Sequence, residues 1–138
     1  MKSYRDVTAT FETALDFLRF GVSAASKAPL YYGHGTDNAL DDIHALITSS
    51  LNLPHDVSPM LLHGRLTQDE KTNLADKLWR RIEEHVPVPY LTQEAYFFDL
   101  PFYVDERVLI PRSPLAECLS TQFTPWVNPE CVTRILDV

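Results

Sequence analysis

The sequence has 138 residues, which is enough for one compact domain and too few for two of ordinary size. Its 12 basic and 19 acidic residues give a formal net charge of −7, which argues against direct nucleic-acid binding because that needs clustered Lys and Arg. No apolar run is long enough to cross a bilayer, the acidic start is unlike a secretory signal, and the two cysteines stand apart. We therefore expect a cytoplasmic protein with reduced thiols, no membrane contact and no direct nucleic-acid contact.

The first part of the chain has the periodicity of amphipathic helices. Residues 7–25 carry apolar side chains at spacings of three and four, which predicts one helix whose buried stripe is Phe11, Leu15, Leu18 and Val22. Residues 31–38 then form a glycine-containing turn that can cap a second helix over residues 39–51. The predicted buried stripe of that second helix is Leu40, Ile43, Ile47 and Leu51.

Two further helical pieces are expected before residue 86. Ser58 and Pro59 open a short one that Gly64 closes. Thr67 and Glu70 have the spacing of a capping box, which predicts a helix continuing to about Glu84. Its apolar face is Leu74, Leu78 and Ile82. We expect most of its charged residues, Arg81 among them, and the Asp41-Asp42 pair of the preceding helix to face solvent.

Composition changes after residue 86, where prolines and aromatic residues become frequent. Residues 94–100 and 102–104 read as two strands with Asp99-Leu100-Pro101 as the turn between them, and residues 108–110 as a third extended piece. A helix over residues 115–123 and a β-type run over residues 134–138 follow. The predicted boundary between the helical part and the strand-forming part lies at residues 86–89.

Aromatic side chains cluster in the strand-forming part, at Tyr90, Tyr96, Phe97, Phe98, Phe102 and Tyr103. Such a cluster can stack on nucleic-acid bases, but with few basic residues around it we expect packing in a core or against another domain. If these side chains are exposed, they favour self-association.

The sequence contains few features of a catalytic centre. A cofactor loop needs glycines where backbone N–H groups approach the ligand, and no glycine follows Gly64. The five histidines are scattered, with no metal-binding spacing, and no motif of an activated serine or cysteine is present. The most unusual stretch is Pro111-Arg112-Ser113-Pro114, where a fixed arginine either faces an anionic group or simply lies on the surface.

Two separated motifs resemble those of a known family. Tyr32-Gly33-His34-Gly35-Thr36-Asp37-Asn38 is one, and the run from Tyr90 through Val108-Leu109-Ile110-Pro111-Arg112-Ser113-Pro114 to Ile135-Leu136-Asp137 is the other. Both resemble the N-terminal part of bacterial N5-glutamine methyltransferases, which use S-adenosylmethionine (SAM). The Pro-Arg-Ser-Pro form resembles the branch that methylates a glutamine of a large-subunit ribosomal protein, the third in the usual numbering.

The resemblance implies a mainly α fold. A helical bundle, residues 1–86, would serve substrate recognition; residues 87–138 would form a β-hairpin linker and the first strand of a truncated Rossmann-like methyltransferase domain. It also implies that Pro111 and Arg112 lie near SAM in the full-length enzyme. The glycine loop and the Asn-Pro-Pro-Tyr motif that hold SAM and the glutamine amide in that family are absent from these 138 residues.

Two functional hypotheses follow. In the first, the chain is the N-terminal part of a protein-glutamine methyltransferase, inactive alone and unable to bind SAM tightly. In the second, it is a stand-alone helical adaptor without catalysis. We favour the first, because an adaptor is not expected to finish on an unpaired β-type run such as residues 134–138.

Overall fold

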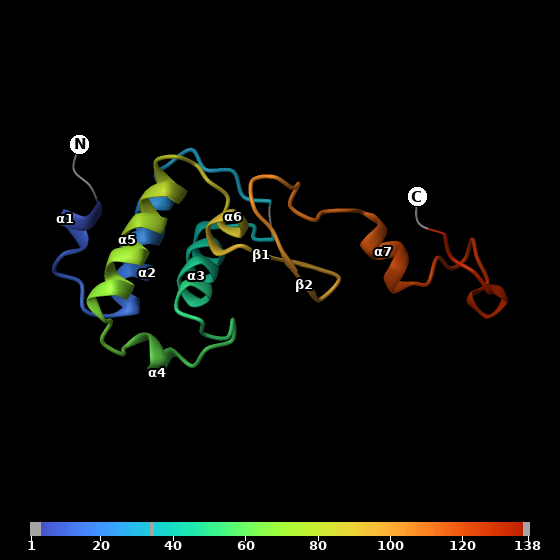
Figure 1. Cartoon of the computed structure of the whole chain (residues 1–138), viewed down its shortest axis with the longest axis horizontal. Coiled ribbons are helices and arrows are strands. Elements are labelled where there is room, and N and C mark those ends of the chain that lie inside the picture. The colour runs from blue at the N-terminus through green and yellow to red at the C-terminus, as the bar shows by residue number, and fades with distance from the viewer. Residues whose placement is uncertain (1–3, 34, 137–138) are drawn as a thin grey trace.

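The computed structural model describes residues 4–33 and 35–136. A body of packed helices comes first, a two-stranded hairpin lies at its side, and the C-terminal segment extends away from both (Figure 1). The expected fold class, mainly α with a short β-hairpin, is confirmed.

The N-terminal segment forms two helices, α1 (Tyr4–Thr8) and α2 (Ala14–Ala25), so the single helix predicted over residues 7–25 is wrong. The cause is a capping box that periodicity alone does not reveal. The backbone N–H of Asp16 donates to Thr13 Oγ1 at 3.3 Å, and the Asp16 carboxylate accepts from the Thr13 N–H at 2.9 Å. These bonds begin a new helix after Thr13.

The buried face of α2 also differs from the predicted stripe. Its buried residues are Ala14, Phe17, Gly21 and Ala25, whereas Leu15 is 38% exposed. The small residues allow close packing, because a Cβ on Gly21 would lie 2.7 Å from Ile43 Cγ2 and 2.9 Å from Leu78 Cδ2. The sequence stripe missed this face because alanine and glycine add little to an apolar pattern.

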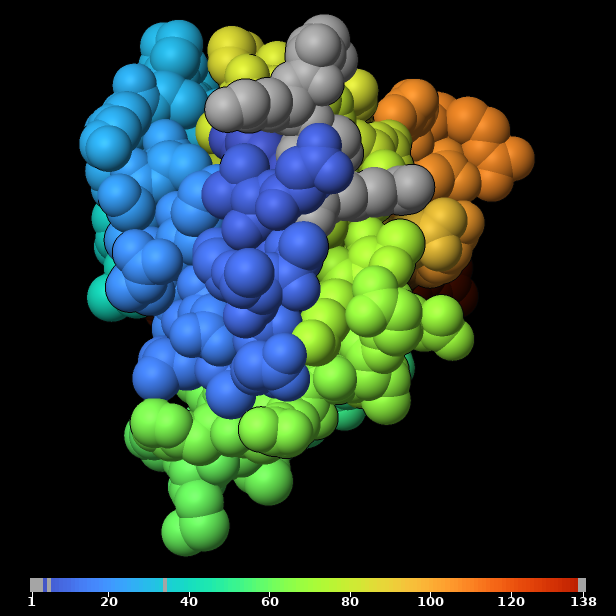
Figure 2. Space-filling view, turned by 90° about the vertical axis from the view of Figure 1, so that its left-hand side faces the viewer, coloured from blue at the N-terminus to red at the C-terminus, as the bar shows by residue number. Residues whose placement is uncertain are grey.

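Helix α1 covers the outer edge of the seam between α2 and α5. Figure 2 shows it in dark blue on the surface of the helical body. The Tyr4 ring makes edge-to-face contacts with Phe20 and Trp79, both at 5.3 Å between ring centroids, and its hydroxyl donates to Glu83. The first helix thus ties its two neighbours together.

Helices α3 (Ala39–Ser50), α4 (Pro59–Leu62) and α5 (Gln68–Ile82) confirm the three helices expected before residue 86. Asn38 caps α3, and Thr67 with Glu70 forms the predicted capping box of α5. Helices α2, α3 and α5 pack against one another around Phe17, Ile43, Leu46, Leu74 and Leu78, all fully buried.

A short helix that the sequence did not predict, α6 (Val88–Thr92), follows. Val88 and Leu91 of α6 join the helical core and pack beside α3. The core of the helical body therefore includes residues beyond 86. The division of the chain into two functional domains at that residue stays a prediction.

The hairpin consists of β1 (Glu94–Phe97) and β2 (Leu100–Tyr103), paired antiparallel with Glu94 opposite Tyr103. Its turn is at Phe98 and Asp99, with φ of 51° and 59°. Of the predicted turn over residues 99–101, Asp99 is confirmed, whereas Leu100 and Pro101 belong to β2. Pro101 lies within β2, a position that an edge strand tolerates because one side of it has no ladder partner.

Most of the hairpin aromatics do not pack in a core of the described residues, and their packing against another domain stays a prediction. Tyr96, Phe98, Phe102 and Tyr103 are 41–66% exposed. Beside the hairpin, a second small cluster buries Ala95, Val104 and Ile110 against Tyr90.

The C-terminal segment contains α7 (Leu115–Ser120), shorter than predicted, and a 3-10 turn at Pro129–Cys131. Residues 108–110 and 132–136 form no strand, so both expected extended elements are wrong within the described residues. Ile135 and Leu136 are 90% and 84% exposed, because no neighbouring strand pairs with them. Residues 137 and 138 of the predicted β-type run lie outside the described part.

Candidate functional site

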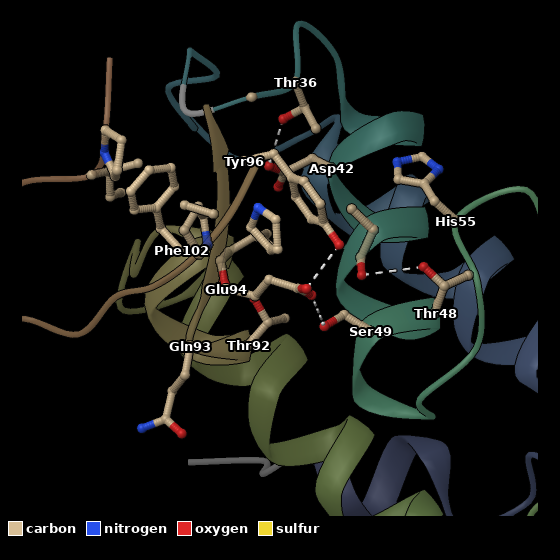
Figure 3. A pocket seen from close by; sticks show the side chains of 18 of the residues that line it. Thr36, Asp42, Thr48, Ser49, His55, Thr92, Gln93, Glu94, Tyr96 and Phe102 are labelled. Atoms are coloured by element: carbon tan, nitrogen blue, oxygen red, sulfur yellow. Dashed lines mark hydrogen bonds between the residues drawn. The ribbon is translucent and has the colours of Figure 1, made fainter. Parts of the chain in front are cut away.

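A groove of about 890 Å³ lies between α3, α6 and the hairpin. The loop before α3 and the segment at residues 110–112 complete its walls (Figure 3). Both family-like motifs of the sequence thus border one cavity. Two of their lining residues, Thr36 and Ile110, are 74 residues apart in the chain. We take this groove as the candidate site.

One face of α3 forms the floor of the groove. Ala45, Thr48 and Ser49 line it, at the spacings of three and four that share a helix face, and Asn52 lines it just after the helix ends. Thr48 is buried, and its hydroxyl is satisfied by donating to the His44 carbonyl at 2.9 Å. The Ser49 hydroxyl instead points across the groove to the hairpin (Figure 3).

Glu94, at the start of β1, is the carboxylate that Ser49 reaches. The Ser49 hydroxyl donates to Glu94 Oε2 at 3.4 Å, and the Tyr96 hydroxyl donates to Oε1 at 2.8 Å (Figure 3). The hydrogen bond to the carboxylate raises the pKa of Tyr96 above its ordinary value. Both oxygens of Glu94 therefore accept from neutral hydroxyls, which hold the carboxylate in one orientation.

The loop before α3 is held by a buried ion pair. Arg81 Nε donates to Asp42 Oδ2 at 2.6 Å, and Arg81 Nη2 donates to the Tyr31 carbonyl at 3.1 Å. The Thr36 hydroxyl donates to the other oxygen of Asp42 at 2.9 Å (Figure 3). The solvent exposure predicted for Asp42 and Arg81 is therefore wrong: the two side chains are 6% and 4% exposed.

The segment bearing Pro111 and Arg112 is fastened to α6 and the hairpin. Ile110 is buried in the small cluster, and the Tyr90 hydroxyl donates to the Val108 carbonyl at 2.7 Å. Pro111 is half-buried and Arg112 is exposed, and both line the groove. Within the described residues, Arg112 makes no ion pair. The placement near SAM that we expected for these two residues stays a prediction.

The groove has no metal centre within residues 4–33 and 35–136, where no group of three or more potential ligands comes together. The His44 and His55 rings lie 5.5 Å apart, with His55 on the groove wall, and burial lowers the pKa of His44. His34 lies outside the described residues. Across that same described part, no helix has the length and apolar character that crossing a membrane would require.

Sequence reasoning missed Ser49, Glu94 and Tyr96 as groove residues. The stripe predicted for residues 39–51 includes only apolar residues, and the strand pattern predicts of Glu94 and Tyr96 only that they lie in an extended segment. Their alternation at positions 94 and 96, which puts them on one face of a strand, was the available signal.

Comparison with known proteins places the chain beside a set of bacterial enzymes. It is 44% identical over 126 residues to the ribosomal protein uL3 glutamine methyltransferase of Xanthomonas campestris pv. campestris, and 44% identical over 127 residues to that of Neisseria meningitidis serogroup A. The corresponding protein of Francisella tularensis subsp. tularensis is 34% identical over 135 residues. No protein-family model matches the chain.

The similarity covers nearly all of this chain but less than half of each relative. It extends over 91–97% of the chain and 41–43% of the three relatives, and it falls in their N-terminal portion. The chain thus spans well under half the length of the curated relatives that it matches.

Proposed function

The chain is related over nearly its whole length to the N-terminal portion of ribosomal protein uL3 glutamine methyltransferases, and we propose that it is the substrate-recognition part of such an enzyme. In this proposal, the whole protein methylates a glutamine side-chain amide of ribosomal protein uL3 in the cytoplasm. The observation that carries the proposal is the 34–44% identity over at least 91% of the chain.

The groove supports a role in recognition. It is lined by a rigid helix face, a fastened loop and a hairpin whose aromatic side chains are exposed. Exposed aromatic residues next to oriented polar groups are typical of protein-binding surfaces, because rings supply contact area at small cost in side-chain entropy.

The same residues do not fit a complete SAM site. Close approach of backbone N–H groups to a cofactor favours glycine. The groove has two glycines, Gly33 and Gly35 in the loop before α3, but the strand-forming part of the chain, which resembles the start of the SAM-binding domain, has none after Gly64. Of the groove residues, we assign only Pro111 and Arg112 to the neighbourhood of SAM, which supplies the methyl group when it is bound. We propose that the 138-residue chain alone does not bind SAM tightly.

The chemistry explains why recognition and transfer are separable. An amide nitrogen is a weak nucleophile because its lone pair is delocalised into the carbonyl. Methyl transfer therefore depends on holding that nitrogen in line with the methyl group. A module that orients the protein substrate contributes to this alignment without contacting the reacting atoms.

Calorimetric titration tests the proposal. We expect purified uL3 to bind the chain with a dissociation constant in the micromolar range, and SAM to give no heat of binding. Mass spectrometry of uL3 incubated with the chain and SAM should show no added methyl group. Absence of uL3 binding, or methylation by the chain alone, would contradict the proposed division of roles.

A further inference from the structure

We propose that the groove binds a lysine or arginine side chain of the protein substrate, with Glu94 as its counterion and the Tyr96 ring as its wall. The proposal rests on the proposed function for the identity of the partner. The preference for a basic side chain is argued from the residues that line the groove.

The first observation that supports the proposal is that the Glu94 carboxylate is held by hydroxyl groups and has no basic partner among the described residues. Within the described residues, Glu94 makes no ion pair. Other carboxylates in this part of the chain, such as Asp16 and Glu70, also make none, but those two cap helices, whereas Glu94 lines the groove. Its two oxygens are instead held by the hydroxyls of Ser49 and Tyr96. A carboxylate that is oriented but not neutralised is ready to accept a charge-assisted hydrogen bond from a cation.

The C-terminal end of α3 adds to the negative electrostatic potential around Glu94. Ser49 lies in the last turn of this 12-residue helix, and that turn contains no basic residue. The C-terminal end of a helix carries partial negative charge, which favours a nearby cation. At the end of α3 the carbonyls of residues 47–49 also accept backbone N–H groups of residues 51–53. Lys77 reaches the helix end from α5 by donating to Ser50 Oγ at 3.0 Å, and its pKa is lowered, chiefly by burial.

The Tyr96 ring supplies the wall. It is 62% exposed, and Figure 3 shows it extending from the hairpin toward α3, with its hydroxyl at Glu94. A guanidinium or ammonium group that approaches Glu94 can therefore also contact the face of the ring, which attracts cations.

Overall charge agrees with a basic occupant. The chain carries a net charge of −7, and a protein that binds ribosomal RNA needs Lys and Arg to neutralise phosphates. The charges of the two partners are therefore complementary, which favours rapid and specific association. The groove contributes its own cation, Arg112, only from an exposed position.

Two small probes test the chemistry without the partner. We expect N-acetyl-arginine methylamide, at millimolar concentration, to shift the backbone NMR signals of Ser49, Glu94 and Tyr96. N-acetyl-citrulline methylamide has nearly the same shape without the charge and should shift them at least fivefold less. Equal shifts from both probes, or none from either, would overturn the proposal.

Matched variants assign the effect to Glu94. Glu94→Gln should abolish the arginine-induced shifts, whereas Glu117→Gln on α7 makes the same charge change outside the groove and should leave them intact. If arginine shifts the signals only after Arg112→Ala, Glu94 is already paired with Arg112 and the proposal is wrong.

Titration with uL3 separates this inference from the proposed function. We expect Glu94→Gln to weaken uL3 binding about tenfold, equivalent to about 1.4 kcal/mol, with Glu117→Gln unchanged. Failure of the unaltered chain to bind uL3 while the arginine shifts persist would contradict the proposed function alone. Equal uL3 binding by the unaltered chain and by Glu94→Gln would contradict the present inference alone.

Discussion

Arg81 and Asp42 form a buried ion pair that joins α5 to α3, with 2.6 Å between Arg81 Nε and Asp42 Oδ2. Through its second nitrogen, Arg81 also holds the Tyr31 carbonyl, and its guanidinium lies 5.7 Å from the centre of the Tyr32 ring. The pair therefore fixes the loop that borders the groove, and groove geometry depends on two residues that do not themselves need to contact a partner.

Breaking this pair should destabilise the protein strongly. Arg81→Met leaves the Asp42 carboxylate buried with only Thr36 as a described side-chain partner, and we expect a loss of about 3–5 kcal/mol in the free energy of unfolding. Urea denaturation measures this loss. The neighbouring Arg80→Met removes only exposed ion pairs and should cost less than about 1 kcal/mol. Equal effects of the two variants would show that the buried pair has no special role.

The close packing of α2 predicts a second stability effect. Gly21→Ala places a methyl group within 3 Å of Ile43 and Leu78 side-chain atoms, so we expect a net loss of about 1–2 kcal/mol although alanine favours helices. Ser23→Ala on the exposed side of the same helix should be neutral or slightly stabilising. Thermal unfolding compares the two, and a stabilised Gly21→Ala protein would refute the close contact.

Asp16 predicts a specific pH dependence. Hydrogen bonds from the backbone N–H groups of Glu12 and Thr13, and then from the Thr13 hydroxyl, lower its pKa from the ordinary 3.8. A lowered pKa in the folded state contributes stability above pH 3.8, and that contribution is lost as the pH falls through the folded value. Asp16→Asn should therefore lose less stability than the unaltered protein on acidification below that pH. Parallel stability curves for the two proteins would exclude this contribution.

Arg112 predicts an effect on the whole enzyme. In a full-length protein of this type, Arg112→Ala should raise the SAM dissociation constant, because the arginine would face the carboxylate at the methionine end of the cofactor. Arg107→Ala is a matched control, since Arg107 pairs with its neighbour Asp105 and does not line the groove. An unchanged SAM dissociation constant and turnover for Arg112→Ala would remove this residue from the site.

Sequence patterns correctly predicted those helices whose caps and apolar faces are determined by residues close together in the chain. The capping residues Asn38 and Thr67 and the apolar face of α5 were recovered because each is encoded within a few residues. The break before α2 was missed because Thr13 and Asp16 form a capping box inside an apolar periodicity that continues through it.

The features that shape the groove depend on contacts distant in sequence. Asp42 and Arg81 are 39 residues apart, and Ser49 and Glu94 are 45 apart. No local pattern distinguishes such residues from ordinary surface charges and hydroxyls. The sequence singled out two family-like motifs, at residues 32–38 and 108–114, but only the fold shows that lining residues from both border the same cavity.

Competition in a methylation assay tests the central claim most directly. The 138-residue chain is added in excess to the uL3 glutamine methyltransferase of Xanthomonas campestris, with uL3 and SAM, and the rate of methyl incorporation is measured. We predict inhibition that is competitive with uL3 and unaffected by raising the SAM concentration, because the chain captures the protein substrate. A rate unchanged at a large excess of the chain, or inhibition relieved by SAM, would contradict a role in substrate recognition.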